Sequence, residues 1–558
     1  MEAPIIRTCE SLVFALILAG ASSPVTASVA ANADPARTYV RARVAAMNGD
    51  HSDAAELLSA LSTRRPGVTE LRTKALAEAL GAGRMDLAIP AARAFKPEDL
   101  ASDARLLLVA DDIKRGRITE ANRLLAVKGE VGDLAFLSLL LDAWTAAERK
   151  DFTRALQVID QISPNSLLAP FKAEQRALVM LKAGQSAEAE TFARRAIGNA
   201  GPRELKVRLT LAEAFLKAGD KARAETILDG IGADGFAPAQ AIRAGKPIAI
   251  GIDSLPEALS EVIAALAADV ARRQRGVPPF GLVQVARYLD PKNSSATALM
   301  AVLLQTRDRD QEALALLRAI PASDALSSPI RDLEAQILIE EENLPAAFGI
   351  AAAAASAPGA GAADFARLGN VQTAMGRFDE AARSFDRAVA MAKDIGVRDE
   401  IWPLYLLHAD ALSKANRWDD VKRSLHAALE IAPDQPLILN YLGYAKLERG
   451  EDLDAAEALI RKASELSPDD ASIVDSLGWA QFKRGKVDAA IDTLQLAATK
   501  DPTQAEIHEH LGDALFTNGR RVEARFAWNA ALITAADDIA RRVRAKLEHG
   551  LTKDNAAP

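Results

Sequence analysis

The sequence of 558 residues contains one cysteine, Cys9, and six histidines. A chain with no second cysteine forms no internal disulfide, and nothing after residue 9 supplies a thiolate nucleophile or a cysteine metal site. Aromatic residues make up only 5% of the chain while hydrophobic residues make up 49%. This balance, rich in alanine and leucine, favours closely packed helices over sheets.

An excess of positive charge is also missing, because the formal net charge is −8. Nucleic acid is therefore not an expected partner, since phosphate backbones need a basic surface. Long hydrophobic runs are absent beyond the N-terminus; the longest small apolar tract, Ile350–Ala363, is broken by Ser, Pro and Gly. We expect no integral membrane segment after cleavage of the N-terminal signal.

The first 30 residues have the three-part layout of a secretory signal peptide. Arg7 precedes an apolar run from Leu12 to Ala19, and small-residue cleavage sites end at Ala27 or Ala30. We therefore predict export to the periplasm. Cys9 precedes the apolar run, whereas a lipoprotein needs its cysteine just after it, so no lipid anchor is expected. The alternative is an uncleaved, cytoplasmic protein.

A small residue, nearly always alanine, returns about every 34 residues along the chain. The positions are Ala54, Ala88, Ala121, Ala155, Ala189, Ala224, Ala313, Ala347, Ala381, Val421, Ala456, Ala490 and Ala524. A period of 34 indicates an array of helical hairpins. Five residues earlier stands a glycine in eight repeats, at Gly49, Gly83, Gly116, Gly184, Gly219, Gly376, Gly485 and Gly519. We expect the turn between paired helices at this glycine.

The strongest repeats resemble the tetratricopeptide repeat family. Leu477-Gly478 and Leu511-Gly512 match the paired Leu-Gly of the family, and Gly485, Ala490 and Pro502 match its later fixed positions. The resemblance runs from about residue 35 to about residue 535 and is weaker in the N-terminal half. It implies an all-α fold, a right-handed α-solenoid of about 14 helix pairs, in two blocks.

The rhythm of the repeat divides the chain into five regions. After the signal peptide (1–30) we expect a degenerate block (31–230), an insertion with one degenerate repeat (231–296), a regular block (297–536), and a capping helix with a disordered tail (537–558). The stretch Gly230–Asp253 is rich in glycine and proline and is expected to be a loop. Limited proteolysis should cut between residues 230 and 256. A helix is expected over Leu255–Ala271.

Residues typical of catalysis are scattered. His508 and His510 are two apart, so on a helix they point in different directions and do not make the zinc-protease pattern. His408 and His426 have no evident nucleophile near them. Acidic pairs such as Asp111-Asp112 and Asp537-Asp538 are expected on solvated faces. We therefore predict no enzyme activity, no catalytic residue, no metal site and no cofactor.

In the resembled family, the first helix of each pair lines a concave groove that binds proteins or peptides. Three first helices supply the predicted groove: Asn440, Tyr444 and Leu447; Asp475, Trp479 and Phe482; Glu509, Asp513 and Phe516. The spacing of three and four puts each trio on one helical face. Trp528 and Trp418 lie in second helices and are expected in the core. Trp479→Ala is expected to weaken partner binding with little change in melting temperature.

The resemblance implies a non-enzymatic scaffold or adaptor of the bacterial cell envelope, with protein or peptide partners. One specific case is an adaptor of a carboxyl-terminal processing protease. Two alternatives stay open: a periplasmic factor in polysaccharide secretion or envelope assembly, and a cytoplasmic assembly platform. Family members that bind chaperone tails use a Lys-Asn clamp, which Asn440 and Asp475 do not reproduce, so that partner is disfavoured.

Overall fold

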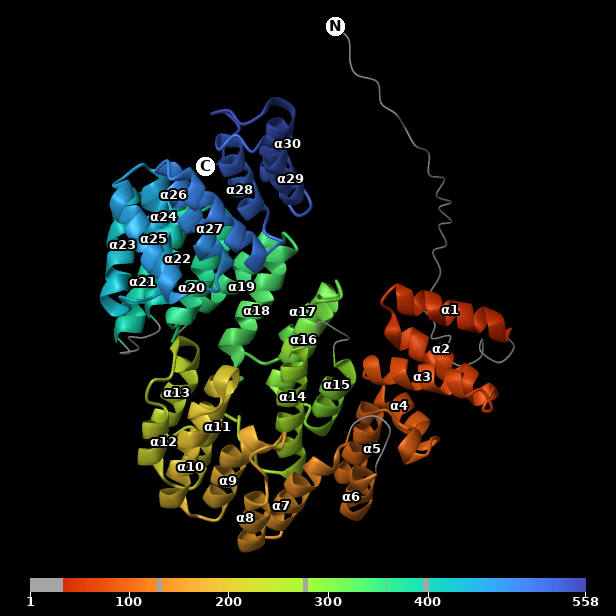
Figure 1. Ribbon diagram of the computed structural model, residues 1–558. Helices are drawn as coiled ribbons and strands as arrows, with labels where there is room; N and C mark the ends of the chain where they lie inside the picture. Colours follow the sequence, from red (N-terminus) through yellow and green to blue (C-terminus); the bar gives the residue numbers. More distant parts are fainter. Residues whose placement is uncertain (1–33, 128–132, 274–278, 358, 395–400, 558) are drawn as a thin grey trace, which may run out of the picture.

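The computed structural model describes residues 34–127, 133–273, 279–357, 359–394 and 401–557. The predicted signal peptide and its cleavage sites lie outside these residues. Within them the chain is all helical, without strands, as predicted (Figure 1). Thirty α-helices are present; α13 (Phe236–Arg243) and α30 (Asp537–His549) stand alone, and the others form 14 antiparallel pairs in the described part of the chain.

The pairs follow one another along the chain. They are α1 (Pro35–Met47) with α2 (His51–Arg64), α3 (Thr69–Gly81) with α4 (Met85–Arg93), α5 (Ser102–Lys114) with α6 (Ile118–Ala126), α7 (Ser138–Glu148) with α8 (Phe152–Asp160), α9 (Lys172–Lys182) with α10 (Ser186–Gly198), α11 (Glu204–Lys217) with α12 (Lys221–Ile227), α14 (Leu255–Arg273) with α15 (Phe280–Leu289), α16 (Ser294–Gln305) with α17 (Asp310–Arg318), α18 (Ser327–Glu340) with α19 (Leu344–Ser356), α20 (Ala362–Ala374) with α21 (Phe378–Asp394), α22 (Ile401–Lys414) with α23 (Trp418–Ile431), α24 (Pro436–Glu448) with α25 (Leu453–Leu466), α26 (Ala471–Lys483) with α27 (Val487–Lys500), and α28 (Ala505–Thr517) with α29 (Arg521–Ala531).

The recurrent small residue lies in the second helix of its pair. All thirteen of these residues are 0% exposed. The facing helix carries the Leu-Gly glycine in the regular repeats: a Cβ on Gly478 would lie 2.6 Å from Leu494 Cγ and 3.2 Å from the Leu494 backbone nitrogen. Small residues on both helices therefore allow the close crossing on which each pair depends.

The turn within each pair needs a left-handed residue. All eight predicted glycines have positive φ, from 69° to 85°. Four repeats place a larger residue there in the same conformation, with φ from 55° to 62°; these residues are Lys150, Asp308, Glu342 and Asn416. The hairpin geometry is thus retained where the glycine is lost, at a conformational cost of about 1 to 2 kcal/mol per residue.

The stretch expected to be a loop contains a helix. η6 (Ala233–Gly235) and α13 lie within it, and Ala239 and Ile242 of α13 are fully buried. The expectation was wrong because Pro238 is accommodated in the first turn of a short helix that packs on α11 and α12, and glycines flank that helix on both sides. The helix expected over Leu255–Ala271 is confirmed as α14. The division into blocks at 231–296 stays a prediction, and one apolar core extends from Ala55 to Val371.

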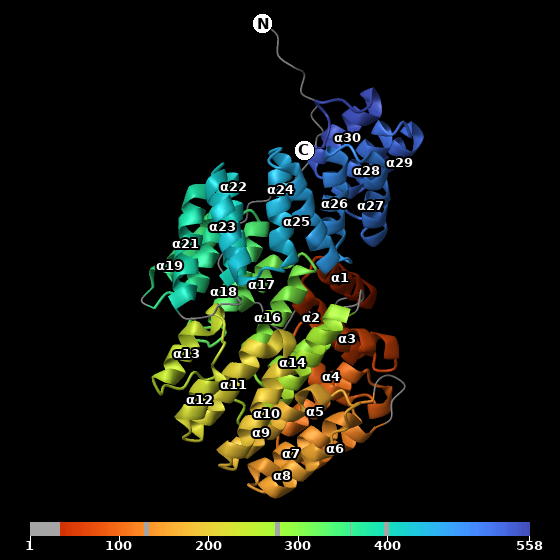
Figure 2. The same cartoon turned by 60° about the vertical axis from the view of Figure 1, so that its left-hand side comes forward.

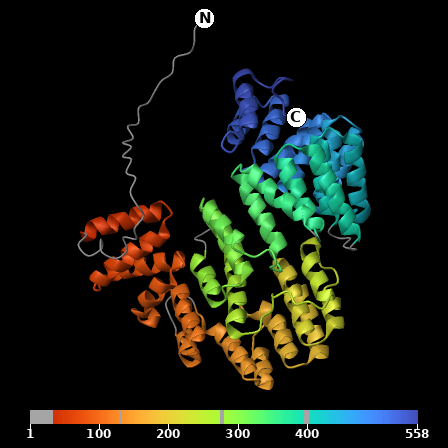
Figure 3. The same cartoon turned by 180° about the vertical axis from the view of Figure 1, so that it is seen from behind.

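Helices α14 and α15 lie inside the curve that α3 to α11 describe (Figures 1 and 3). They contact α3, α5 and α7, which precede them by more than a hundred residues. Gln284 Nε2 donates to the Gly81 carbonyl at 3.1 Å, and the backbone N–H of Leu255 donates to Glu148 Oε1 at 2.8 Å. We call the side of α3, α5, α7, α9 and α11 that faces them the N-terminal inner face.

The last pairs form a second curved stack, from α20 to α29, closed by α30 (Figure 2). A helix, α30, is present where the capping helix was expected, and its Ile539 and Val543 are buried. Asp537 and Asp538 are exposed, as expected. The chain then turns at Gly550, whose φ is 80°, and returns to α28, where the backbone N–H of Ala557 donates to Asp513.

Candidate functional site

The nine predicted groove residues lie on α24, α26 and α28, and we call the side of these helices that carries them the C-terminal inner face. Four of them are half-buried: Asn440, Tyr444, Phe482 and Phe516. The other five are buried: Leu447, Asp475, Trp479, Glu509 and Asp513. The helices therefore bring the residues to one face, but the chain itself covers more than half of them.

The aromatic part of this face is a stack of rings. Trp479 lies between Phe482, with ring centroids 4.9 Å apart, and His510, with ring centroids 4.1 Å apart. Trp479 is only 1% exposed. The expectation that Trp479→Ala would hardly change the melting temperature is therefore replaced, because removing a packed aromatic side chain costs about 3 to 5 kcal/mol. Trp528 is confirmed in the core, and Trp418 is half-buried.

Each acidic residue of this face has a partner from its own chain. Both oxygens of Glu509 are bound, one by Arg542 at 2.7 Å and one by the Lys546 ammonium at 2.7 Å. The same ammonium lies 2.8 Å from Asp513 Oδ2. Burial raises the pKa of Glu509, but the hydrogen bonds from Arg542 and Lys546 outweigh it and hold that pKa below its ordinary value. The carboxylates are thus neutralised by α30.

Two neighbouring groups respond differently to burial. Burial raises the pKa of Asp513 above its ordinary value in spite of Lys546, so its charged form depends on the hydrogen bonds it accepts. One of these comes from Trp528 Nε1 at 2.9 Å. Burial lowers the pKa of His510, but the Asp475 carboxylate, 2.9 Å from Nδ1, raises it more, so the net shift is upward. This pair joins α26 to α28.

The chain end covers this face. The backbone N–H of Ala557 donates to Asp513 Oδ2 at 3.0 Å, and Ala557 is 3% exposed. It belongs to an apolar cluster with Leu447 and Trp479, against which Tyr444 and Phe482 pack. The tail was expected to be disordered. That expectation was wrong for residues 550–557, because a hydrogen-bonded turn and this cluster hold them.

One polar atom of the face has no partner within the described residues. Asn440 Oδ1 is buried and accepts no hydrogen bond there. A buried acceptor without a donor is costly, and a backbone N–H of a bound segment would satisfy it. One helical turn away on α24, burial raises the pKa of Tyr444 above its ordinary value of 10. Its hydroxyl is therefore a neutral hydrogen-bond donor at every pH near neutrality.

Sequence reasoning missed three residues that decide how this face is closed, namely Lys546, His510 and Ala557. Lys546 could have been found, since it follows Ile539 and Val543 at helical spacing and therefore lies on the buried side of α30. His510 was expected to have only a structural role, and it has one. No signal in the sequence pointed to Ala557.

Two other sequence expectations need correction. Asp111 and Asp112 are 1% and 2% exposed, not solvated. Three arginines bind the pair, and Tyr288 of α15 donates to Asp111 Oδ1 at 3.1 Å. His408 was expected to have no nucleophile near it, yet Ser424 Oγ lies 3.3 Å from its Nδ1. Ser424 is buried and donates to the Tyr405 carbonyl at 2.9 Å, so its hydroxyl is not poised to attack.

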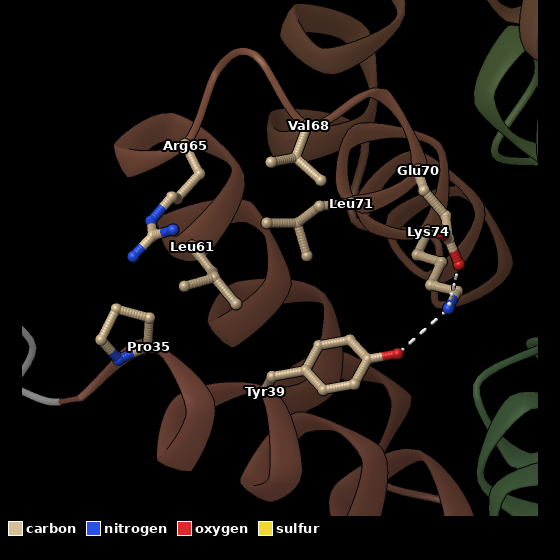
Figure 4. Close-up of a pocket in the computed structure, with 8 residues that line it drawn as sticks. All are labelled: Pro35, Tyr39, Leu61, Arg65, Val68, Glu70, Leu71 and Lys74. Atoms are coloured by element: carbon tan, nitrogen blue, oxygen red, sulfur yellow. Dashed lines mark hydrogen bonds and ion pairs between the residues drawn. The ribbon is translucent and has the colours of Figure 1, made fainter.

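A shallow hollow lies at the opposite end of the chain, between α1, α2 and α3 (Figure 4). Its volume is about 240 Å³, and Tyr39, Leu61 and Leu71 form its apolar wall. Lys74 Nζ bridges Glu70 at 2.8 Å and the Tyr39 hydroxyl at 3.0 Å. Among the residues that the structure describes, Arg65 is the only charged side chain that lines the hollow besides this bridge.

Two features of the described residues bear on function classes. Between residue 34 and residue 557, apart from the gaps given above, no three His, Cys, Asp or Glu side chains are grouped so that they could hold a metal ion. Among the helices of the same ranges, none combines the length and hydropathy needed to cross a bilayer.

Comparison with known proteins agrees with the repeat pattern. Residues 406–471 and 476–538 match one tetratricopeptide repeat family description, and residues 365–398 match another. The segment 476–538 contains both Leu-Gly pairs, Leu477-Gly478 of α26 and Leu511-Gly512 of α28. No curated protein matches the sequence.

Several solved structures are similar over long stretches. Yeast Tom70 has 13% identity and a TM-score of 0.33, with 92% of this chain and 95% of that chain covered. A tetratricopeptide repeat protein from Parabacteroides merdae has 13% identity and a TM-score of 0.36, with 45% and 96% covered. The human IFIT1 dimer with m7Gppp-AAAA has 14% identity and a TM-score of 0.33, with 79% and 96% covered. All three TM-scores are low. The chain carries tetratricopeptide repeats over residues 365–398, 406–471 and 476–538.

Proposed function

We propose that this protein is a non-enzymatic interaction scaffold that binds an extended segment of a protein partner on its C-terminal inner face. Tetratricopeptide repeats are protein-interaction modules, and the matched segments include α24, α28 and the part of α26 from residue 476 onward. The observation that carries the proposal is Ala557: a piece of the chain's own backbone already lies there, with its N–H on a buried carboxylate and its side chain in an apolar cluster.

The chemistry of the face fits a peptide. The half-buried aromatic side chains Tyr444, Phe482 and Phe516 provide apolar contact, and aromatic side chains are frequent hot spots of binding energy in protein interfaces. Asp513 and Asn440 offer acceptors for backbone N–H groups. The cations Arg542 and Lys546 are paired with the carboxylates of the face, so they are not available to bind a polyanion. Lys483 lies 5.0 Å from the centre of the Trp479 ring, and one such ammonium is far from the basic surface that nucleic acid needs.

For the cellular setting we propose the periplasm, on the strength of the N-terminal signal pattern. Within that setting we propose an envelope adaptor that presents substrates to a carboxyl-terminal processing protease. N-terminal sequencing of the protein from cells tests the first step: a start near Asn32 supports export, and an intact Met1 contradicts it. Genomic neighbours separate the protease adaptor from the polysaccharide-secretion alternative.

The binding face is tested with a matched pair of phenylalanine variants. Phe482 is half-buried on the C-terminal inner face, whereas Phe526 is 72% exposed on the second helix α29. Affinity capture from envelope extract with each purified variant, followed by titration of the captured partner, compares the two faces. We expect Phe482→Ala to weaken binding at least tenfold and Phe526→Ala to leave it unchanged. The reverse pattern would place the binding site on the outer side and contradict the proposal.

A further inference from the structure

Residues 550–557 form a short segment with an internal turn. The backbone N–H of Thr552 donates to Asn555 Oδ1 at 2.7 Å, and Asn555 Nδ2 donates to the Gly550 carbonyl at 2.9 Å. Asn555 is buried, while Thr552, Lys553 and Asp554 are exposed. The turn therefore presents its charged residues to solvent and directs the following alanines towards the stack.

The attachment of this segment to the inner face is slight beyond its first two residues. Gly550 lies against Phe516, and Leu551 packs against the apolar cluster formed by α27 to α30. Beyond them, the hydrogen bonds of buried Asn555 stay within the segment, and the contact with the face consists of Ala557, with one methyl group in the apolar cluster and one hydrogen bond to Asp513. Exposed segments with few buried side chains open at low free-energy cost. This tail can consequently leave the face without unfolding the helices beneath it.

When the tail leaves, it uncovers one hydrogen-bond acceptor and an apolar cluster on the C-terminal inner face. Asp513 would lose the N–H of Ala557, and its carboxylate already resists burial, as its raised pKa shows. Leu447, Trp479 and Phe482 would lose the alanine side chain that completes their cluster. A replacement must therefore bring a backbone N–H and a small apolar side chain to the same place.

We infer that residues 550–557 are an internal occupant of the C-terminal inner face, and that the partner segment is an extended run of small apolar residues that displaces them. The inference rests on the proposed function, because it takes this face to be the binding site. The tail then acts as a competitor in cis, and it keeps the apolar cluster covered until a segment of similar chemistry arrives.

The first test measures whether the tail covers the face, without any partner. In a full chain carrying Cys9→Ser, the variant Leu447→Cys places a thiol in the cluster that contains Ala557, and a maleimide reports its accessibility. Ala557→Glu would bring a carboxylate against Asp513 and expel the tail. Thr552→Glu adds the same charge at an exposed position of the tail and is the control. We expect labelling at least ten times faster with Ala557→Glu and unchanged with Thr552→Glu. Equal rates in all three chains would overturn the inference.

The second test measures competition. Peptides selected from a displayed random library on the Ala557→Glu chain are titrated against that chain, the Thr552→Glu chain and the unaltered chain. We expect sequences rich in alanine and other small residues, with affinity for the Ala557→Glu chain at least tenfold higher than for the other two. Equal affinity for all three chains would overturn the internal competitor and leave the binding face intact. Selected peptides whose affinity does not respond to Phe482→Ala would overturn the proposed binding face itself.

Discussion

The two inner faces of this molecule are closed in different ways. The N-terminal inner face is covered by two whole helices, α14 and α15. Their buried side chains belong to the same apolar core as those of α3 to α11. The C-terminal inner face is closed by a tail of which only Asn555 and Ala557 are buried. The same side of the repeat thus serves as permanent core in one half and as an exchangeable surface in the other.

Burial and hydrogen bonding explain this difference. Helix α14 buries nine side chains, including Glu261, which is bound by Lys206 and lies within 3.6 Å of Arg203. Around Asp111, three arginines and Tyr288 bind the carboxylate; burial raises its pKa, but these hydrogen bonds hold it below the ordinary value. A helix fixed by charge pairs and by core contacts at once does not leave without unfolding its surroundings.

The largest expected effect comes from breaking the permanent closure. Val262 of α14 is 0% exposed, so Val262→Asp would bury a charge without a partner. We expect the free energy of unfolding to fall by more than about 4 kcal/mol, measured by chemical denaturation. The control is Asp269→Ala in the same helix, where the side chain is 40% exposed and pairs with Arg272 and Arg273; it should change the free energy of unfolding by less than about 1 kcal/mol. A small effect of Val262→Asp would mean that α14 is not part of the core.

The charge pairs of α30 come next. The Lys546 ammonium is 0% exposed and holds both Glu509 and Asp513. Lys546→Met leaves two buried carboxylates without this partner and should cost about 3 to 5 kcal/mol in chemical denaturation. Arg544→Met removes the same charge from a less buried position of the same helix and should cost almost nothing. If the two variants lost the same free energy of unfolding, the net charge of α30 would matter and the specific contacts of Lys546 would not.

The pair of His510 and Asp475 predicts a pH dependence at the C-terminal inner face. The pKa of His510 is raised above its ordinary value of 6.5 by Asp475, with Asp513 and Glu509 acting in the same direction, against burial. Its stabilisation is therefore complete below about pH 6.5 and is lost as the pH rises through the folded-state pKa. A folded-state pKa one pH unit above the unfolded value corresponds to about 1.4 kcal/mol of stabilisation.

This dependence is measured as the free energy of unfolding between pH 5.5 and pH 8.5. We expect a decline over this range in the unaltered chain and a flatter profile for Asp475→Asn. An identical slope in both chains would assign the decline to other groups. The half closed by α14 has no such buried histidine within its described residues, so the local unfolding of α30 and α28 should follow the pH more than that of α14.

The smallest effect concerns the turns. Lys150 has φ of 62° at the position where Gly485 has φ of 75°. Lys150→Gly should stabilise the chain by about 1 kcal/mol, and Gly485→Lys should destabilise it by a similar amount, both measured by thermal unfolding. Opposite signs would mean that the contacts of the Lys150 side chain outweigh its backbone strain.

Contacts within one helical hairpin could be predicted from the sequence, whereas contacts between residues far apart in the sequence could not. The alanine of each pair and the turn glycine are set by contacts within one hairpin, so Ala490 is buried and Gly485 is left-handed, as expected. Asp111 lies 177 residues from Tyr288, and no periodicity links them. The pattern placed this carboxylate in solvent because nothing in one repeat shows that α15 will cover it.

In the candidate site, too, local features were predictable and long-range contacts were not. Helical spacing correctly grouped Asp475, Trp479 and Phe482 on one face of α26, because that depends only on the helix. Their burial depends on α30 and on Ala557, which belong to the irregular end of the chain. The composition of residues 550–557 is typical of a disordered tail, because no sequence pattern distinguishes the buried Ala557 from an exposed alanine.

The most direct measurement is hydrogen exchange of the full chain, followed by mass spectrometry, with and without a peptide selected on the Ala557→Glu chain. We predict that residues 550–557 exchange at least ten times faster than α14, and that the peptide accelerates exchange of the tail while it protects α26 and leaves α14 unchanged. Equal protection of the tail and α14, or a bound peptide that leaves exchange of the tail unaltered, would contradict the distinction between a permanent and an exchangeable closure.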